Sequence, residues 1–360
     1  MQDHKVTRQA AVFVCAAIVA AGAGKSAGSP PPGRPHRLTI EGENIVTFMP
    51  EVGLNPVKIN YRARVEYLID TRLGDDFKPR SEPASAAKQA ARKPTSAARK
   101  AKSSVNERHE EIDARVAGAV DLALHSTEMR LRQNGKSMLD TRLTRSKFQG
   151  RVQPGTPALT LNANEAPPRL QAIMKTYDSK CASLLVDDNA RLVDRRFRSD
   201  GPQGALVETL LSIHTPIPRD FGAWEAPTQL AMGQGQTAKG TLRFEKRKDS
   251  LSKTGGFVQV KVAGVLKAEG AVVGRFIKDG TYTVTGEQTY DPRSREWTAA
   301  RWSVDVETDL ADADGVLVAH AQGKMIVDSH SVDAAGTSAS SSSFATSPIE
   351  AKPTAADGKR

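Results

Sequence analysis

The segment at residues 57–70, VKINYRARVEYLID, alternates between two kinds of side chain. Apolar or aromatic residues occupy every odd position from Val57 to Ile69, and charged or amide residues occupy most of the even positions. Successive side chains of a β-strand point to opposite faces of the sheet, so alternation over this length predicts a half-buried antiparallel strand.

The same alternation returns after residue 239 in several further segments. They read GTLRFEKRK, GFVQVKVAGVLKA, GRFIKDGTYTVTGEQTYDP, REWTAARWSVDVETDL and GVLVAHAQGKMIVDS. Most of these segments are separated by residues that favour turns, such as Asp291-Pro292 and Asp314-Gly315. The chain is therefore predicted to be mainly β, with antiparallel strands that follow one another along the sequence.

Two hairpins are expected in the first half of the chain. Asn134-Gly135 is a strong hairpin signal, because a type I′ turn needs positive φ at both central residues. A second turn is expected at Asp188-Asn189. The region 106–124 fits two patterns, because its apolar residues suit a helix as well as a strand. We favour a long strand that folds back at Asn134-Gly135, with a helix over 106–124 as the alternative.

One helix is predicted at about 201–213. Asp200 can cap its start, Pro202 is tolerated in the first turn, and Pro216 follows its end. The expected organisation is a signal peptide at 1–23, a Pro/Gly-rich linker leading into the first strand at 24–55, a first β meander at 56–213 with a disordered basic insertion at 78–104, a linker at 214–238, a second β meander at 239–330 and a disordered tail at 331–360.

The N-terminal segment Ala10–Gly24 is apolar and follows Lys5 and Arg8. Its 15 residues fall short of the roughly 20 that a spanning helix needs. A basic start, a short apolar stretch and Ala21-Gly22-Ala23 are typical of a secretory signal peptide, cleaved near Ala23. A retained anchor, or lipid attachment at Cys15, is the alternative. Export to the periplasm or the outside of the cell is therefore expected.

The net charge of +10 is concentrated in one segment. Residues 78–104 hold eight basic residues and one acidic residue, a net of +7 that leaves +3 for the rest. Without an apolar face the segment is expected to be disordered. It is either a solvated loop or a basic arm that contacts an anionic envelope polymer or membrane surface. Nucleic acid is not expected, because no aromatic residues are interleaved with the charges. The arm residues are Lys78, Arg80, Lys88, Arg92, Lys93, Arg99, Lys100 and Lys102.

No motif points to catalysis, a metal or a cofactor. The glycines of GQGQTAKGT, 233–241, resemble a nucleotide-binding loop but lead into a predicted strand, where such a loop should lead into a helix. The histidines are isolated; His320 would need Asp291 or Asp305 to converge with it across the sheet. Cys181 remains alone after cleavage and is interpreted as a small buried hydrophobe.

Three tryptophans suggest where an apolar ligand would bind. Trp302 alternates in phase with Ala300 and Val304 and is expected in the core. Trp297, beside a turn, and Trp224, in the linker after the helix, are expected at the open side of a curved sheet, where amphipathic rings commonly meet a bound ligand.

The hairpin motif Tyr290-Asp291-Pro292-Arg293-Ser294-Arg295-Glu296, leading into an alternating strand, resembles exported β-sheet proteins of the bacterial cell envelope that are themselves uncharacterised. More distantly, residues 240–328 are similar in pattern to the curved half-barrel of the periplasmic lipoprotein-carrier group. The resemblance implies an antiparallel curved sheet or half-barrel, as one sheet or two meanders, with one or two covering helices. The carrier group's functional residues do not match this chain, so none is transferred.

The leading hypothesis is a non-enzymatic exported protein that binds an apolar or amphipathic ligand, such as a lipid, on the concave face of its sheet. The main alternative is a structural or interaction module of the envelope, whose concave face is filled by its own side chains. A hydrolase of envelope material is the third possibility, and it would need convergent carboxylates or a His/Asp pair.

Overall fold

The structure is a computed structural model, and it describes residues 33–73, 115–151, 155–197, 205–218, 222–231, 237–247, 256–272 and 275–332. Several predictions concern residues outside these ranges. They are the signal peptide and its cleavage near Ala23, the basic arm at 78–104, the tail beyond residue 332, and the start of the predicted helix at 201–204.

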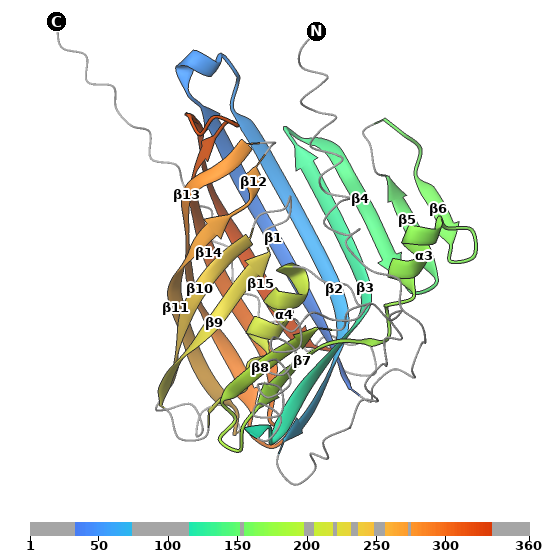
Figure 1. The fold of residues 1–360 in the computed structure, drawn as a ribbon, viewed down its shortest axis with the longest axis vertical. Helices are drawn as coiled ribbons and strands as arrows, with labels where there is room; N and C mark the ends of the chain where they lie inside the picture. The colour runs from blue at the N-terminus through green and yellow to red at the C-terminus, as the bar shows by residue number, and fades with distance from the viewer. Residues whose placement is uncertain are drawn as a thin grey trace, which may run out of the picture.

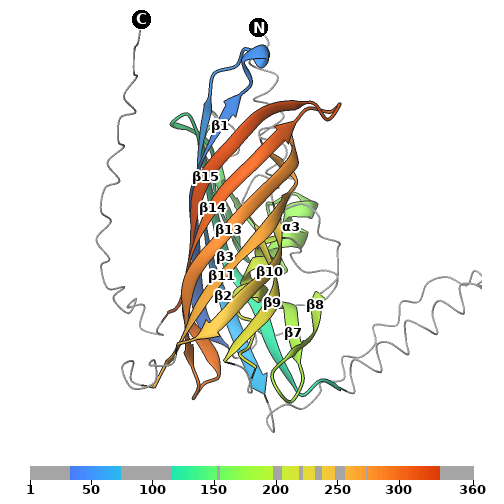
Figure 2. The same ribbon diagram turned by 90° about the vertical axis from the view of Figure 1, so that its left-hand side faces the viewer.

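The described strands belong to one curved antiparallel sheet, which confirms the predicted fold class (Figures 1 and 2). In spatial order the strands are β6 (Leu159–Asn162), β5 (Lys147–Arg151), β4 (Lys136–Thr144), β3 (Gly118–Gln133), β2 (Val57–Leu73), β1 (Arg34–Phe48), β15 (Leu317–Ser331), β14 (Glu296–Ala311), β13 (Arg275–Asp291), β11 (Val258–Glu269), β10 (Thr237–Lys246) and β9 (Ala223–Ala231). Off this path, β7 (Lys180–Val186) pairs with β3 and with β8 (Leu192–Phe197), and the short β12 (Ala271–Val272) pairs with β13.

Strand β1 (Arg34–Phe48) shows that most of the expected linker and entry segment at 24–55 is a strand; residues 24–32 lie outside the described part of the chain. It pairs with β2 on one side and with β15 on the other, so the two expected meanders are parts of a single sheet. Its inward positions include Gly42 and Asn44 among apolar residues. These two residues interrupt the apolar alternation that would otherwise have marked residues 34–48 as a strand. Likewise, β9 lies within the expected linker at 214–238.

The hairpin predictions are confirmed. Asn134 and Gly135 both have positive φ, 48° and 77°, between β3 and β4. The chain also reverses at residues 188–189 between β7 and β8. In the ambiguous region 106–124, residues 118–124 belong to strand β3, as we favoured, and Arg115 is helical. Residues 106–114 lie outside the described part of the chain.

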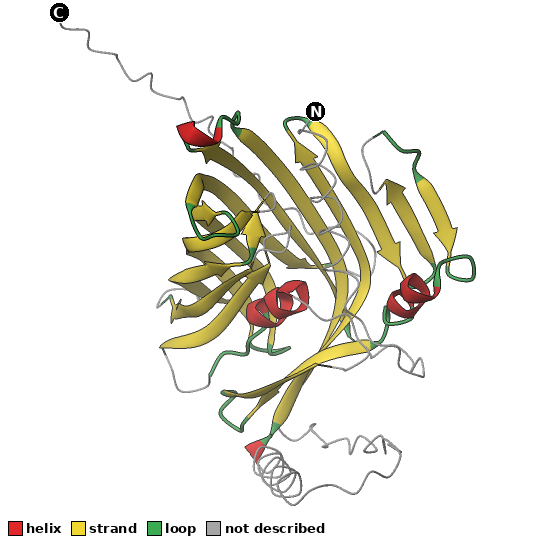
Figure 3. Cartoon of the chain, turned by 45° about the horizontal axis from the view of Figure 1, so that its top comes forward, coloured by secondary structure: helices red, strands yellow, loops and turns green. Residues whose placement is uncertain are grey.

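Two α-helices lie among the described residues. The predicted helix is α4 (Ala205–Ile213), and it packs against β9 inside the curve of the sheet, as Figure 3 shows. The second helix, α3 (Pro168–Met174), was not predicted from the sequence. Pro167 and Pro168 stand at its start, where the missing N–H of proline costs least.

The core lies on the concave face, where glycines on one strand make room for large side chains on the next. A Cβ on Gly286 would lie 2.8 Å from the Trp302 ring, and a Cβ on Gly264 would lie 2.8 Å from Leu242. Trp302 is fully buried, as expected from its phase. Glycines at such positions allow close approach across the sheet and permit it to bend.

Candidate functional site

The concave face has two parts that differ in what covers them. In the first, which we call the helix half, the carbonyl groups at the end of α4 are bonded to the sheet. Gln288 Nε2 donates to the Ile213 carbonyl at 3.3 Å, and Trp297 Nε1 donates to the Thr215 carbonyl at 2.7 Å. These bonds satisfy groups that a helix end leaves without partners, and they hold α4 against β13 and β14.

A buried polar cluster completes the helix half. The Tyr67 hydroxyl lies 2.8 Å from His214 Nε2 and 2.8 Å from Ser329 Oγ. The His36 ring stacks on Tyr67 with centroids 5.5 Å apart and meets the His214 ring edge-on at 5.0 Å. The cluster therefore joins β1, β2 and β15 to the residue that follows α4.

Burial sets the protonation of this cluster. Burial lowers the pKa of His36 to about 4, and the charges of Arg34 and His330 act in the same direction. Burial lowers the pKa of His214 well below its ordinary value, with a smaller contribution from His36. Burial also raises the pKa of Tyr67. The cluster is thus neutral near pH 7, and its hydrogen bonds are suited to fixing the helix end.

The second part, which we call the tip half, lies toward the end of the sheet where β1 joins β2. Here Asn44 on β1 and Tyr61 on β2 occupy diagonal inward positions, because Asn44 pairs with Ile59, two residues before Tyr61. Both side chains are buried. Within the described part of the chain, neither Asn44 Oδ1 nor the Tyr61 hydroxyl has a hydrogen-bond partner.

Glycines leave the space that these two polar groups occupy. A Cβ on Gly42 would lie 2.2 Å from the Tyr61 hydroxyl, and a Cβ on Gly323 would lie 1.9 Å from Asn44 Oδ1. Burial raises the pKa of Tyr61, and Tyr282 adds to the effect, so the phenol keeps its proton. The pair therefore offers one O–H donor and one carbonyl acceptor on the same small area of the sheet.

An aliphatic cluster separates this polar pair from the end of the sheet. Its buried members come from β1, β2, β14 and β15, and they are Val46, Ile59, Leu310, Ala319 and Ala321. The larger core cluster, which includes Tyr61, lies on the other side of the pair. A molecule whose polar group bonded Asn44 and Tyr61 would therefore have apolar side chains on both sides of that group.

The structure places the two tryptophans expected to contact a ligand within the core. Trp297 is buried at the end of α4, where it also meets Tyr290 edge-on with centroids 5.2 Å apart. Trp224 is buried in β9 and stacks on Phe244 at 5.3 Å. The two rings therefore do not form an exposed rim, and their role as ligand contacts stays a prediction.

Two other residues considered in the sequence analysis, His320 and Cys181, make contacts that need no functional explanation. His320 Nδ1 lies 2.5 Å from Asp309 Oδ1, whereas the sequence offered Asp291 or Asp305 as residues that could converge with it. Because Asp309 pairs directly with His320 across β14 and β15, strand register decides this contact. Cys181 is buried and its thiol donates to the Leu122 carbonyl, as expected of a small core residue.

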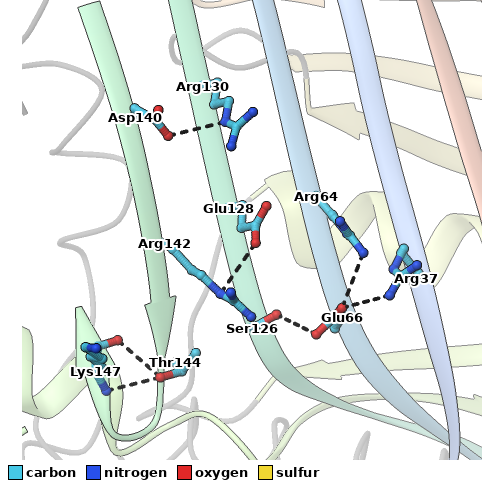
Figure 4. A network of polar contacts seen from close by, with 10 residues as sticks. All are labelled: Arg37, Arg64, Glu66, Ser126, Glu128, Arg130, Asp140, Arg142, Thr144 and Lys147. Atoms are coloured by element: carbon cyan, nitrogen blue, oxygen red, sulfur yellow. Dashed lines mark hydrogen bonds and ion pairs between the residues drawn. The ribbon is translucent and has the colours of Figure 1, made fainter. Parts of the chain in front are cut away.

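The outer face of the sheet carries a polar network that the sequence did not reveal (Figure 4). Glu66 accepts hydrogen bonds from Arg37 Nη2 at 3.1 Å and Ser126 Oγ at 3.0 Å, and Arg64 lies 3.7 Å away. These residues come from β1, β2 and β3, which are distant in sequence. The outer face thus carries charge pairs, while the concave face is mainly apolar, with a few buried uncharged polar groups.

No family model and no curated protein matches this chain. An outer membrane channel from Pseudomonas putida F1 aligns with 85% of this chain and 99% of its own length, at 6% sequence identity and a TM-score of 0.18. This score is too low to indicate a shared fold. Among the described residues, none of the helices is long and apolar enough to cross a membrane.

Proposed function

We propose that this protein is a non-enzymatic, exported protein that binds an amphipathic molecule on the tip half of its concave face. The observation that carries the proposal is the pair of buried polar groups, Asn44 Oδ1 and the Tyr61 hydroxyl, without partners in the described part of the chain. Buried polar groups almost always have a hydrogen-bond partner, because an unpaired one costs about 1–3 kcal/mol.

The chemistry of the pair indicates a ligand with a neutral polar group. A hydroxyl or amide can accept from the Tyr61 phenol and donate to Asn44 Oδ1. The described residues of the adjoining cluster are aliphatic and offer no cation to offset a buried anion. An uncharged amphiphile, such as a monoacylglycerol, therefore fits better than a fatty acid.

Export and envelope location belong to the same proposal. The signal-peptide pattern at 1–23 supports export. The resemblance to the lipoprotein-carrier group supports ligand binding on a concave sheet face. The basic arm at 78–104 would then contact an anionic envelope polymer or membrane surface by screened attraction.

The proposal is tested by native mass spectrometry of protein purified from its own host, followed by titration with monooleoylglycerol and with oleate. We expect a co-purifying amphiphile and tighter binding of monooleoylglycerol. The double variant Tyr61→Phe, Asn44→Leu should lower that affinity about tenfold or more, since it removes two hydrogen bonds. Thr39→Val, on the outer face of β1, is the matched control and should leave the affinity unchanged.

A purely structural envelope module is the second candidate. It is favoured by the burial of Trp224 and Trp297, which fill part of the concave face with the protein's own side chains. Absence of any co-purifying molecule, together with no measurable monooleoylglycerol binding by the wild type, would establish this candidate in place of ligand binding.

A further inference from the structure

The five residues that follow α4, at 214–218, are all buried. The helix itself lies inside the curve of the sheet, as Figure 3 shows. Side chains of the sheet hold this part of the chain through hydrogen bonds to the Ile213 carbonyl, the His214 ring and the Thr215 carbonyl. These side chains come from three strands, and they are Gln288 on β13, Tyr67 on β2 and Trp297 on β14. We call residues 214–218 the strap.

Two histidine rings meet where the strap joins α4. His214 is the first residue of the strap, and its ring meets the ring of His36 on β1 edge-on, with centroids 5.0 Å apart. Both side chains are buried, and neither ring nitrogen of His36 has a hydrogen-bond partner among the described residues. Since an imidazolium carries two N–H donors, a proton added to His36 would leave both donors unpaired in the core.

The groups that act on these rings oppose a positive charge. Burial lowers the pKa of His36 to about 4, and Arg34 on β1 and His330 on β15 act in the same direction. Burial also lowers the pKa of His214, with a smaller contribution from His36. Tyr67 keeps its proton, because burial raises its pKa. The strap is therefore held closed by a cluster in which every member is neutral.

The carboxylates around Arg34 do not offset this opposition. Glu296 on β14 lies 3.2 Å from Arg34 Nε, and Asp70 on β2 lies 3.4 Å from Arg72 Nε. Asp291 accepts from a backbone N–H and a hydroxyl of its own turn. Among the described residues, a proton on either histidine thus gains no carboxylate partner.

We propose that the strap is an acid-operated latch, in which a proton on His36 or His214 releases residues 214–218 from the sheet and opens the helix half of the concave face. Once the strap is released, the two rings separate and water solvates the imidazolium. The inference goes beyond the proposed function, because it concerns the helix half and stands whether or not a ligand occupies the tip half.

The contacts of the strap favour a local opening over unfolding of the sheet. The strap is held by side-chain hydrogen bonds, whereas β1 is joined to β2 and β15 by continuous backbone pairing. Release breaks the bond between Trp297 and Thr215 and exposes the side chain of Ile217, which is now buried. Acid would therefore give a ligand access to apolar surface that is closed near pH 7.

The test is hydrogen exchange measured by mass spectrometry at about pH 7.5 and about pH 5, with rates corrected for the intrinsic effect of pH. Protection of peptides that cover residues 205–217 should fall about 30-fold from His36 alone, because the released ring binds the proton with its ordinary affinity. Peptides from β1, β2 and β15 should stay more protected than the strap at both pH values.

Two variants assign the effect to the histidines. His36→Phe keeps an aromatic ring beside Tyr67 but takes up no proton, and it should remove about 30-fold of the acid response. His214→Gln keeps an acceptor for the Tyr67 hydroxyl and should also weaken the response. His320→Gln is the matched control, since His320 is exposed on β15 and pairs with Asp309 away from the strap.

Three results would overturn the inference. Equal protection of the strap and the strands at pH 5 would show that acid unfolds the whole sheet. An unchanged acid response in both His36→Phe and His214→Gln would exclude the two histidines. An acid response that His320→Gln weakens as much as His36→Phe would assign it to overall charge. Monooleoylglycerol affinity at pH 7.5 is measured alongside, and its presence or absence decides the tip-half proposal separately.

Discussion

Tyr61 and Tyr67 lie six residues apart on the same face of β2, both buried, yet their hydroxyl groups differ. The Tyr67 hydroxyl is bonded to His214 and Ser329, whereas the Tyr61 hydroxyl has no partner among the described residues. The Tyr67 hydroxyl therefore helps to fix the end of α4, although the ring nitrogens of His36 in the same cluster also have no partner among the described residues. The Tyr61 hydroxyl forms no such bond, and this difference between the two tyrosines is the basis of the ligand proposed for the tip half.

The largest expected effect tests whether the tip half tolerates a methyl group. Gly323→Ala places a Cβ 1.9 Å from Asn44 Oδ1 and 2.3 Å from the Glu43 carbonyl. We expect about 3 kcal/mol lower unfolding free energy, because the backbone must shift. Gly222→Ala is the control: nothing lies within 4 Å of its Cβ. Denaturant unfolding compares the two, and equal stability would show that the glycine contact is unimportant.

The second prediction concerns pH and the helix half. The folded pKa of His36 is about 4 against an ordinary 6.5, so the unfolded chain binds the proton first as pH falls. Stability is therefore full above pH 6.5 and is lost between 6.5 and 4.

From about pH 7.5 to about pH 5 the loss from His36 should be about 2 kcal/mol, and His214 acts in the same direction. His36→Phe keeps an aromatic ring and should make unfolding free energy less dependent on pH. An unchanged pH dependence in that variant would contradict the role of His36.

The third prediction compares the two tyrosines directly. Tyr67→Phe leaves His214 and Ser329 without their shared partner and should lower the unfolding free energy by about 1.5 kcal/mol. Tyr61→Phe removes a hydroxyl with no partner and should be neutral or slightly stabilising without ligand. Chemical denaturation of both variants measures the difference, and equal losses would remove the distinction between the two halves.

The smallest expected effect sets a baseline on the outer face. Glu66→Gln weakens the pairing with Arg37 and Arg64 and should cost about 0.5 kcal/mol, because the pair is partly exposed. Asp140→Asn, which loses only the exposed Arg130 pair, should cost less. Thermal unfolding at low and high salt checks both, and a salt-independent loss would point to packing instead of charge.

The long strands after residue 239 and two hairpins could be predicted because their signals are local. Alternation and the Asn134-Gly135 turn each depend on neighbouring residues alone. Strand β1 was missed because Gly42 and Asn44, which interrupt its alternation, make sense only beside Tyr61 and Gly323. Helix α3 was missed because it is short and begins at two prolines that read as a loop.

The candidate site could not be predicted for a related reason. Asn44 and Tyr61 look unremarkable in the sequence, and Tyr61 was assigned only to an apolar face. The two residues matter because their polar atoms have no hydrogen-bond partner among the described residues. Whether such a partner is in reach depends on how β1 is aligned with β2 and β15. Trp224 and Trp297 were predicted as ligand contacts because large amphipathic rings are easily recognised in a sequence, yet both are buried in the core.

The pairing of β1 with β15 has a consequence for how the chain folds. The first and last described strands are neighbours, with Leu38 opposite Ser329 and Thr47 opposite His320. Contacts between such distant parts of a chain form slowly, because a large loop must close before they are made. We therefore expect the sheet to be completed only after synthesis of β15, and a chain truncated before that strand should expose two unpaired edges and aggregate.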